Sequence, residues 1–164
     1  MKKTLTIIFI CLLCITAYNV KYTLATESSQ YQTGDLIFQT TTSRLAPVIV
    51  AGTKSRFTHV GMIIMRKGKP YVYEASGPVG TVSLKRFVSR GVGKKYVVKR
   101  LDGGLTKDQK KKLLRESRRH RGKGYDSKCL WGDKRMYCSE LVYIKLTYIF
   151  HHSHFAEEGL VFLG

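Results

Sequence analysis

Tyr137-Cys138-Ser139-Glu140-Leu141-Val142-Tyr143 is the most informative stretch of the chain. It sets a cysteine directly before a segment, 139 to 150, in which apolar side chains occupy nearly every side of a helix. A helix that is apolar on all sides belongs in a core. The sequence therefore predicts a buried helix with Cys138 at its N-terminus.

A cysteine in that position is suited to nucleophilic chemistry. The first turn of a helix supplies unpaired N–H groups and a positive dipole end, which together lower the pKa of a thiol. The same geometry makes the Cys138 amide a reasonable donor to an oxyanion. The alternative is that Cys138 is a small buried hydrophobe, which is the commoner fate of a single cysteine.

A histidine upstream favours the nucleophile interpretation. His59 opens an apolar run to Met65, and Glu74 lies on the second strand of a predicted hairpin whose turn is 67–70. An even number of loop residues would place His59 and Glu74 on one face, whereas an odd number would separate them. On one face, Glu74 would orient an imidazole that pairs with the thiolate. Otherwise each is an ordinary strand residue.

The remaining chain predicts a small number of further elements. Residues 34–39 form a turn into a strand, 40–55 a weakly apolar segment with some helical character, and 96–101 another strand. Thr106 and Gln109 have the spacing of a capping box, so we expect a surface helix from Thr106 toward His120. Tyr125 and Asp126 either line a cleft or form a turn, and we favour the turn. Asp35 is expected to accept backbone N–H groups in the turn before its strand.

Five short motifs occur in a telling order. They are Gly-Asp-Leu-Ile-Phe (34–38), Thr-His-Val-Gly (58–61), Tyr-Glu-Ala (73–75), Gly-Tyr-Asp (124–126) and Tyr-Cys-Ser-Glu-Leu (137–141). Each is weak alone, but the set resembles the YiiX-like group of circularly permuted papain-like hydrolases, relatives of NlpC-type cell-wall peptidases and of lecithin retinol acyltransferase. The resemblance implies an α+β fold in which a small antiparallel barrel-like sheet packs against the helix that carries the cysteine. It also implies a catalytic set of Cys138 as nucleophile, His59 as general base and acid, and Glu74 as the third member.

The first residues have the order of a secretory signal. Two lysines follow Met1, residues 5–17 are almost entirely apolar, and Ala25 ends a stretch suited to cleavage. We therefore expect a signal peptide over 1–25, a hydrolase domain over 26–164, and export to the periplasm, cell envelope or exterior. The apolar stretch is short for a membrane span, although an uncleaved anchor is the alternative.

The charge points to anionic partners. The chain carries a formal charge of +18, which falls to +15 without residues 1–25. Basic residues are densest over 94–100 and 107–123, and such runs attract anionic polymers or lipid headgroups. We expect an anionic envelope surface as partner, and no nucleic acid, because the runs lack interleaved aromatic residues. The alternative is a solvated face that confers only solubility.

These observations together predict an exported thiol hydrolase that cleaves an amide or ester through an acyl-cysteine, acting on a peptidoglycan peptide or a lipid, as a monomer and without a cofactor. One rival is a non-catalytic basic binding module. Another is a domain stapled by a Cys129–Cys138 disulfide. His151-His152-Ser153-His154 matches no usual zinc spacing, so we expect no metal site.

Overall fold

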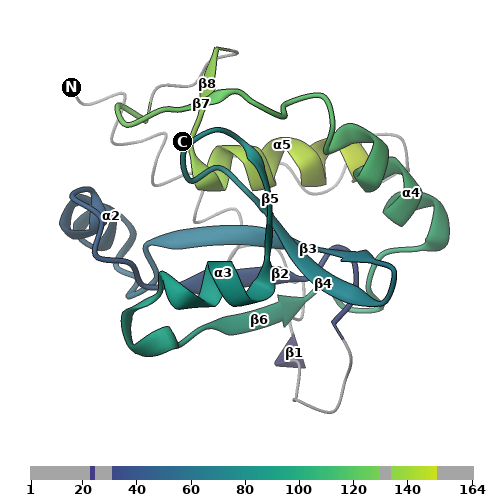
Figure 1. Cartoon of the computed structure of the whole chain (residues 1–164), viewed down its shortest axis with the longest axis horizontal. Helices are drawn as coiled ribbons and strands as arrows, with labels where there is room; N and C mark the ends of the chain where they lie inside the picture. Colours follow the sequence, from purple (N-terminus) through teal and green to yellow (C-terminus); the bar gives the residue numbers. More distant parts are fainter. Residues whose placement is uncertain (1–22, 25–30, 130–133, 151–164) are drawn as a thin grey trace.

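The computed structural model describes residues 23–24, 31–129 and 134–150 (Figure 1). Its elements in chain order are β1 (Thr23–Leu24), β2 (Leu36–Gln39), α2 (Ala46–Thr53), β3 (His59–Arg66), β4 (Lys69–Glu74), β5 (Gly80–Ser83), α3 (Leu84–Ser89), the short 3-10 helix η1 (Val92–Lys94), β6 (Val97–Arg100), α4 (Lys107–Glu116), β7 (Gly124–Tyr125), β8 (Arg135–Met136) and α5 (Cys138–Phe150). The fold is α+β, as expected.

The main sheet has six strands in the order β1-β6-β2-β3-β4-β5, and every neighbouring pair is antiparallel. A separate pair, β7 and β8, is parallel and lies in the segment before α5. Figure 1 shows α5 on one side of the main sheet and α3 on the other. The strand β3 is central, so it receives side chains from both layers.

The hairpin of β3 and β4 settles the face on which the polar residues lie. Its turn consists of Lys67 and Gly68, which both have positive φ angles of 47° and 74°. Two such residues are typical of a type I′ turn, which matches the twist of antiparallel strands. Because the loop is even and Met62 pairs with Tyr73, His59 and Glu74 share one face. Of the two alternatives that the sequence left open, the structure has the even loop.

Each face of the sheet buries its own apolar cluster. Toward α5 lie Leu36, Val60 and Met62 from the strands, with Cys138 and Val142 from the helix. On the opposite face the buried residues come from four strands and α3: Ile37, Ile63, Val72, Val98 and Phe87. The alternation along β3 explains this division, because successive strand residues point to opposite sides. The predicted burial of the cysteine helix is correct.

Helix α4 begins as the sequence predicts and ends earlier. The Thr106 hydroxyl accepts from the Gln109 N–H, and the Gln109 side chain accepts from the Thr106 N–H, which forms the predicted capping box. The regular helix stops at Glu116, not near His120, and the chain continues in successive turns. The Ser117 hydroxyl donates to the Leu114 carbonyl there, and such side-chain bonding competes with the backbone pattern of a helix.

Several elements were absent from the sequence prediction, and two of them lie near His59. Strand β5 and helix α3 both lie in 80–89, where Ser83 caps the helix by accepting from the Arg86 N–H. The segment 40–55, predicted to be weakly helical, contains α2. Helix α3 helps to form the surroundings of His59, because its Phe87 ring stacks on the His59 ring.

The predicted signal peptide lies almost wholly outside the described residues. Only Thr23 and Leu24 of 1–25 are described, and they pair with Arg100 and Lys99 of β6. The division at Ala25 therefore stays a prediction. Within the described ranges, no helix combines the length and apolar character needed to cross a bilayer.

Candidate active site

Cys138 is the first residue of α5, and local contacts hold the start of that helix. The Glu140 carboxylate accepts from the Tyr137 N–H at 3.1 Å, so this acidic residue caps the first turn. Cys138 is 8% exposed and Glu140 is buried. The thiol is thus fixed at a helix N-terminus whose dipole favours negative charge.

His59 links the helix to the hairpin. Its Nε2 lies 2.6 Å from a carboxylate oxygen of Glu74, and its ring also makes a side-chain hydrogen bond with Cys138. Since Nε2 is engaged by Glu74, the bond to Cys138 uses Nδ1. The three residues predicted from sequence are therefore connected in a line: thiol, imidazole, carboxylate.

The backbone supplies further donors to the sulfur. The ladder between β3 and β4 stops at Met62, two residues short of Val60. The Val60 N–H hydrogen-bonds the Cys138 sulfur, and the Ser139 N–H in the first turn of α5 does the same. Donors aimed at a sulfur favour its thiolate form.

The ionisation of the pair follows from these contacts. Burial lowers the pKa of His59, but hydrogen bonds and charge from Cys138 and Glu74 outweigh it and raise the pKa to about 9. Burial raises the pKa of Cys138, yet the His59 imidazolium and the backbone donors bring that pKa below its ordinary value. A thiolate–imidazolium pair is the form that both shifts favour.

An aromatic ring supports the imidazole. Phe87 of α3 is fully buried, and its ring stacks on His59 with centroids 5.6 Å apart at 28°. Gly61 makes room for this packing. A Cβ at Gly61 would lie 2.4 Å from a Val72 methyl and 3.4 Å from the Phe87 ring. Steric crowding therefore explains why the last position of the Thr-His-Val-Gly motif is a glycine.

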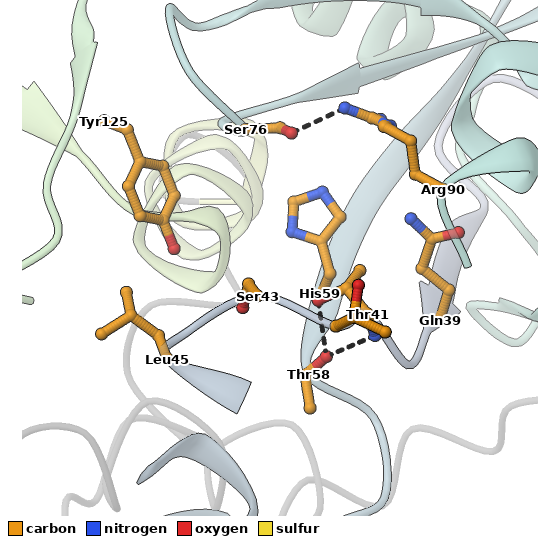
Figure 2. Close-up of a pocket in the computed structure, with 10 residues that line it drawn as sticks. Gln39, Thr41, Ser43, Leu45, Thr58, His59, Ser76, Arg90 and Tyr125 are labelled. Carbon is orange, nitrogen blue, oxygen red and sulfur yellow. Dashed lines mark hydrogen bonds between the residues drawn. The ribbon is translucent and has the colours of Figure 1, made fainter. Parts of the chain in front are cut away.

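A pocket of about 290 Å³ opens beside His59 (Figure 2). Its walls carry one apolar side chain, one tyrosine, one amide, two charged or titratable groups and five hydroxyls: Leu45, Tyr125, Gln39, His59, Arg90, Thr41, Thr42, Ser43, Thr58 and Ser76. Figure 2 shows Tyr125 on one side of the His59 ring and Arg90 on the other. The pocket gives a small polar group access to the imidazole.

Sequence reasoning missed part of this environment. Tyr125 lines the pocket, whereas the sequence favoured a turn, and Asp126 beside it does form a turn by accepting from the Lys128 N–H. Burial raises the pKa of Tyr125 and keeps its hydroxyl protonated. Arg90 and Phe87 belonged to no motif, and only the topology of 80–91 brings them to His59.

Other predicted features fall in place away from the pocket. Asp35 accepts from the Gln32 N–H as expected, and it also forms a two-point ion pair with Arg100, which the sequence did not signal. Cys129 and Cys138 are both free thiols in the structure. The histidine-rich segment 151–154 lies outside the described residues.

The fold and the site are those of a permuted papain-like protein, in which the strand that carries the histidine precedes the helix that carries the cysteine. The sequence profile of the permuted papain-like amidase family YaeF/YiiX, C92, matches residues 30–150. The chain belongs to this family, and the resemblance predicted from the five motifs is confirmed.

This chain is similar in sequence and in structure to YiiX proteins of Escherichia coli. The uncharacterized protein YiiX of Escherichia coli K12 is 45% identical over 114 residues, which are 70% of this chain and 56% of that protein. The chain thus spans just over half the length of this curated relative. The crystal structure of YiiX from Escherichia coli O157:H7, described as a metalloprotein, aligns with a TM-score of 0.72 and 43% identity over 75% of this chain and 68% of that chain.

Because the similar YiiX structure is described as a metalloprotein, we examined whether the residues of this site could hold a metal ion. Over the described residues, no three His, Cys, Asp or Glu side chains are grouped so that they could hold a metal ion. Cys138, His59 and Glu74 bond to one another in sequence instead of converging on a point. This donor set therefore does not fit a resident metal.

Proposed function

We propose that this protein is an exported thiol amidase that cleaves a cell-wall peptide through an acyl-cysteine intermediate. The observation that carries the proposal is the connected line from Cys138 through His59 to Glu74, with the thiol at a helix N-terminus. A lowered thiol pKa and a raised imidazole pKa are the ionisation states that nucleophilic attack requires.

The proposed reaction has two halves. The Cys138 thiolate attacks the amide carbonyl, a C–S bond forms, and the His59 imidazolium donates its proton to the nitrogen as the C–N bond breaks. Water then attacks the thioester while His59 accepts a proton, and the thiolate leaves to release the acid. Glu74 holds the His59 Nε2–H, and the Cys138 amide donates to the transient oxyanion. No cofactor enters either half.

The pocket favours a peptide amide over a lipid acyl group. A volume of about 290 Å³ is at the lower limit for ligand pockets, and six of its ten lining side chains carry hydroxyls. Such a pocket suits a short polar group better than a long acyl chain. The lipid acyl hydrolase or acyltransferase remains the alternative substrate class.

Charge and the N-terminal sequence support the proposed location. The chain is strongly basic, and α4 with the turn after it exposes Lys107, Lys111, Arg115, Arg119 and Arg121. We propose that this basic surface holds the monomeric enzyme against an anionic envelope polymer after export. A binding module without catalysis would use the same surface, so the two functions need a chemical test.

The test is hydrolysis of purified peptidoglycan stem peptides, followed by mass spectrometry, with a long-chain acyl ester assayed in parallel. We expect cleavage of the peptide and its loss in Cys138→Ala by at least about 10⁴-fold, since the nucleophile is removed. Cys138→Ala should bind isolated cell walls as the wild type does. Cleavage of the ester alone would show that the substrate is a lipid acyl group and not a peptide. Equal behaviour of the wild type and Cys138→Ala in every assay would favour the binding module.

A further inference from the structure

The proposed function uses three side chains, but the carboxylate at the end of the line has a second partner. Glu74 is 3% exposed, and while one of its oxygens bonds His59, the other forms an ion pair with Arg90. Arg90 stands directly after α3, in a part of the chain that no motif singled out. A buried carboxylate with both oxygens engaged has little freedom to rotate.

Arg90 is itself held at several points. Its Nη1 donates to the Ser76 hydroxyl at 2.6 Å (Figure 2). Its guanidinium lies over the Phe87 ring, 5.7 Å from the centroid. The same ring stacks on His59. Phe87 therefore supports both cations that flank Glu74, while Ser76 fixes the rotation of the guanidinium plane.

The charge of the site gives Arg90 a purpose beyond packing. A thiolate at Cys138, an imidazolium at His59 and a carboxylate at Glu74 would carry a net charge of −1 in a buried place. A buried unbalanced charge is costly. The Arg90 guanidinium brings the sum to zero in the state that is ready for attack.

We infer that Arg90 is a positioning residue for the proposed reaction, which holds the Glu74 carboxylate aimed at His59 and thereby sets the pH range of the reactive Cys138–His59 pair. This inference rests on the proposed function and deepens it. Arg90 acts through Glu74, and arginine side chains in proteins do not lose their positive charge.

Other titratable groups face the same pair from neighbouring elements. Tyr125 on β7, Cys129 and Asp126 in the loop that follows, and Glu140 on α5 all lie within electrostatic reach of one of the two cysteines. Burial raises the pKa values of both Tyr125 and Cys129, so these two stay neutral where the pair forms. His59 and Arg90 both contact the Glu74 carboxylate directly, so their charges act on it at the shortest range.

The test is the pH dependence of Cys138 alkylation by iodoacetamide, read on the Cys138 peptide by mass, because it needs no substrate. Removing the cation beyond Glu74 disfavours the thiolate, so Arg90→Gln should move the acid limb of the profile up by about one pH unit. Arg90→Lys, which keeps the charge without the planar fork, should restore at least half of that shift. Arg86→Gln is the matched control, since it removes the same charge from an exposed site on α3.

The outcomes separate the inference from the function beneath it. A wild-type limb at the ordinary thiol pKa would overturn both. Two results would overturn the role of Arg90 alone when the acid limb of the wild-type alkylation profile is low. One is an acid limb that does not move in Arg90→Gln, and the other is an equal shift in Arg86→Gln. If Arg90→Gln does not fold, Ser76→Ala is decisive: releasing Nη1 should raise the limb by a smaller amount, and an unmoved limb contradicts the inference.

Discussion

Two of the buried ionisable side chains on helix α5 behave in opposite ways. Cys138 in its first turn has a pKa below the ordinary thiol value, so the buried group is favoured in its charged form. Lys145, two turns later, is 1% exposed, and burial lowers its pKa to about 8, toward its neutral form. In the same helix, Cys138 is therefore favoured in its charged form despite its burial, whereas burial shifts Lys145 toward its uncharged form.

The partners explain the difference. Cys138 faces an imidazolium and two backbone N–H groups, which all favour its anion. The Lys145 ammonium donates to the Glu116 backbone carbonyl at 2.8 Å and to the His120 Nδ1 at 2.6 Å. The Glu116 carboxylate raises the pKa of Lys145, but burial lowers that pKa by more, and the charges of Arg119 and Lys123 lower it further. Burial disfavours charge in both places, and only an opposite charge at hydrogen-bond distance reverses it.

The largest expected effect comes from removing that opposite charge. In His59→Ala the Cys138 thiol keeps its burial and loses its cation, so its pKa should rise above the ordinary value. At a pH of about 6.5, two units below a free thiol, we expect alkylation of Cys138 to fall about 100-fold. Alkylation rates measured on the Cys138 peptide check this, and a rate within about threefold of wild type would contradict the ion pair.

A smaller effect is expected from the carboxylate. Glu74→Gln keeps the shape but leaves Arg90 and the His59 imidazolium without an anion between them. The pKa of His59 should fall from about 9 by about one unit, which corresponds to a tenfold change. NMR titration of the His59 ring measures the shift directly, and Glu116→Gln, which alters the buried carboxylate near Lys145, should leave it unchanged.

Lys145→Met should leave the reactivity of Cys138 unchanged and should alter only the pH dependence of stability. The folded pKa of Lys145, about 8, lies below the unfolded value of 10.5, so the unfolded chain binds the proton more tightly. Wild-type stability should therefore fall as pH drops from 10.5 to about 8, by at most about 3 kcal/mol relative to the variant, with no further change below that range. Urea unfolding of both proteins across this range checks it, and parallel curves would refute the shift.

The sequence predicted the features that depend on near neighbours in the chain or on a regular period. The capping box of Thr106, the helix after Cys138 and the hairpin that joins His59 to Glu74 are of this kind, and all are found. The family was accessible because its motifs occur in a fixed order. The roles of Cys138, His59 and Glu74, the signal peptide and the envelope partners stay predictions.

The features that the sequence concealed depend on the tertiary fold. Arg90 is one of many basic residues, and only the packing of α3 against the sheet carries it to Glu74. The sequence favoured a turn at Tyr125 because the pocket is formed by segments that are distant in the chain. These segments are β7, β3 and the residues before α2, and only the folded structure brings them together. The early end of α4 reflects a hydroxyl–backbone bond at Ser117 that competes with a continuing pattern.

The most direct test of the thiolate–imidazolium pair is the full pH profile of Cys138 alkylation in the wild-type protein, with Cys129 as the internal comparison. We predict a Cys138 acid limb well below about 8.5, the value of a free thiol, and a Cys129 limb above it, because burial raises the pKa of Cys129. Coinciding limbs at or above the free-thiol value would contradict the pair and with it the proposed hydrolase.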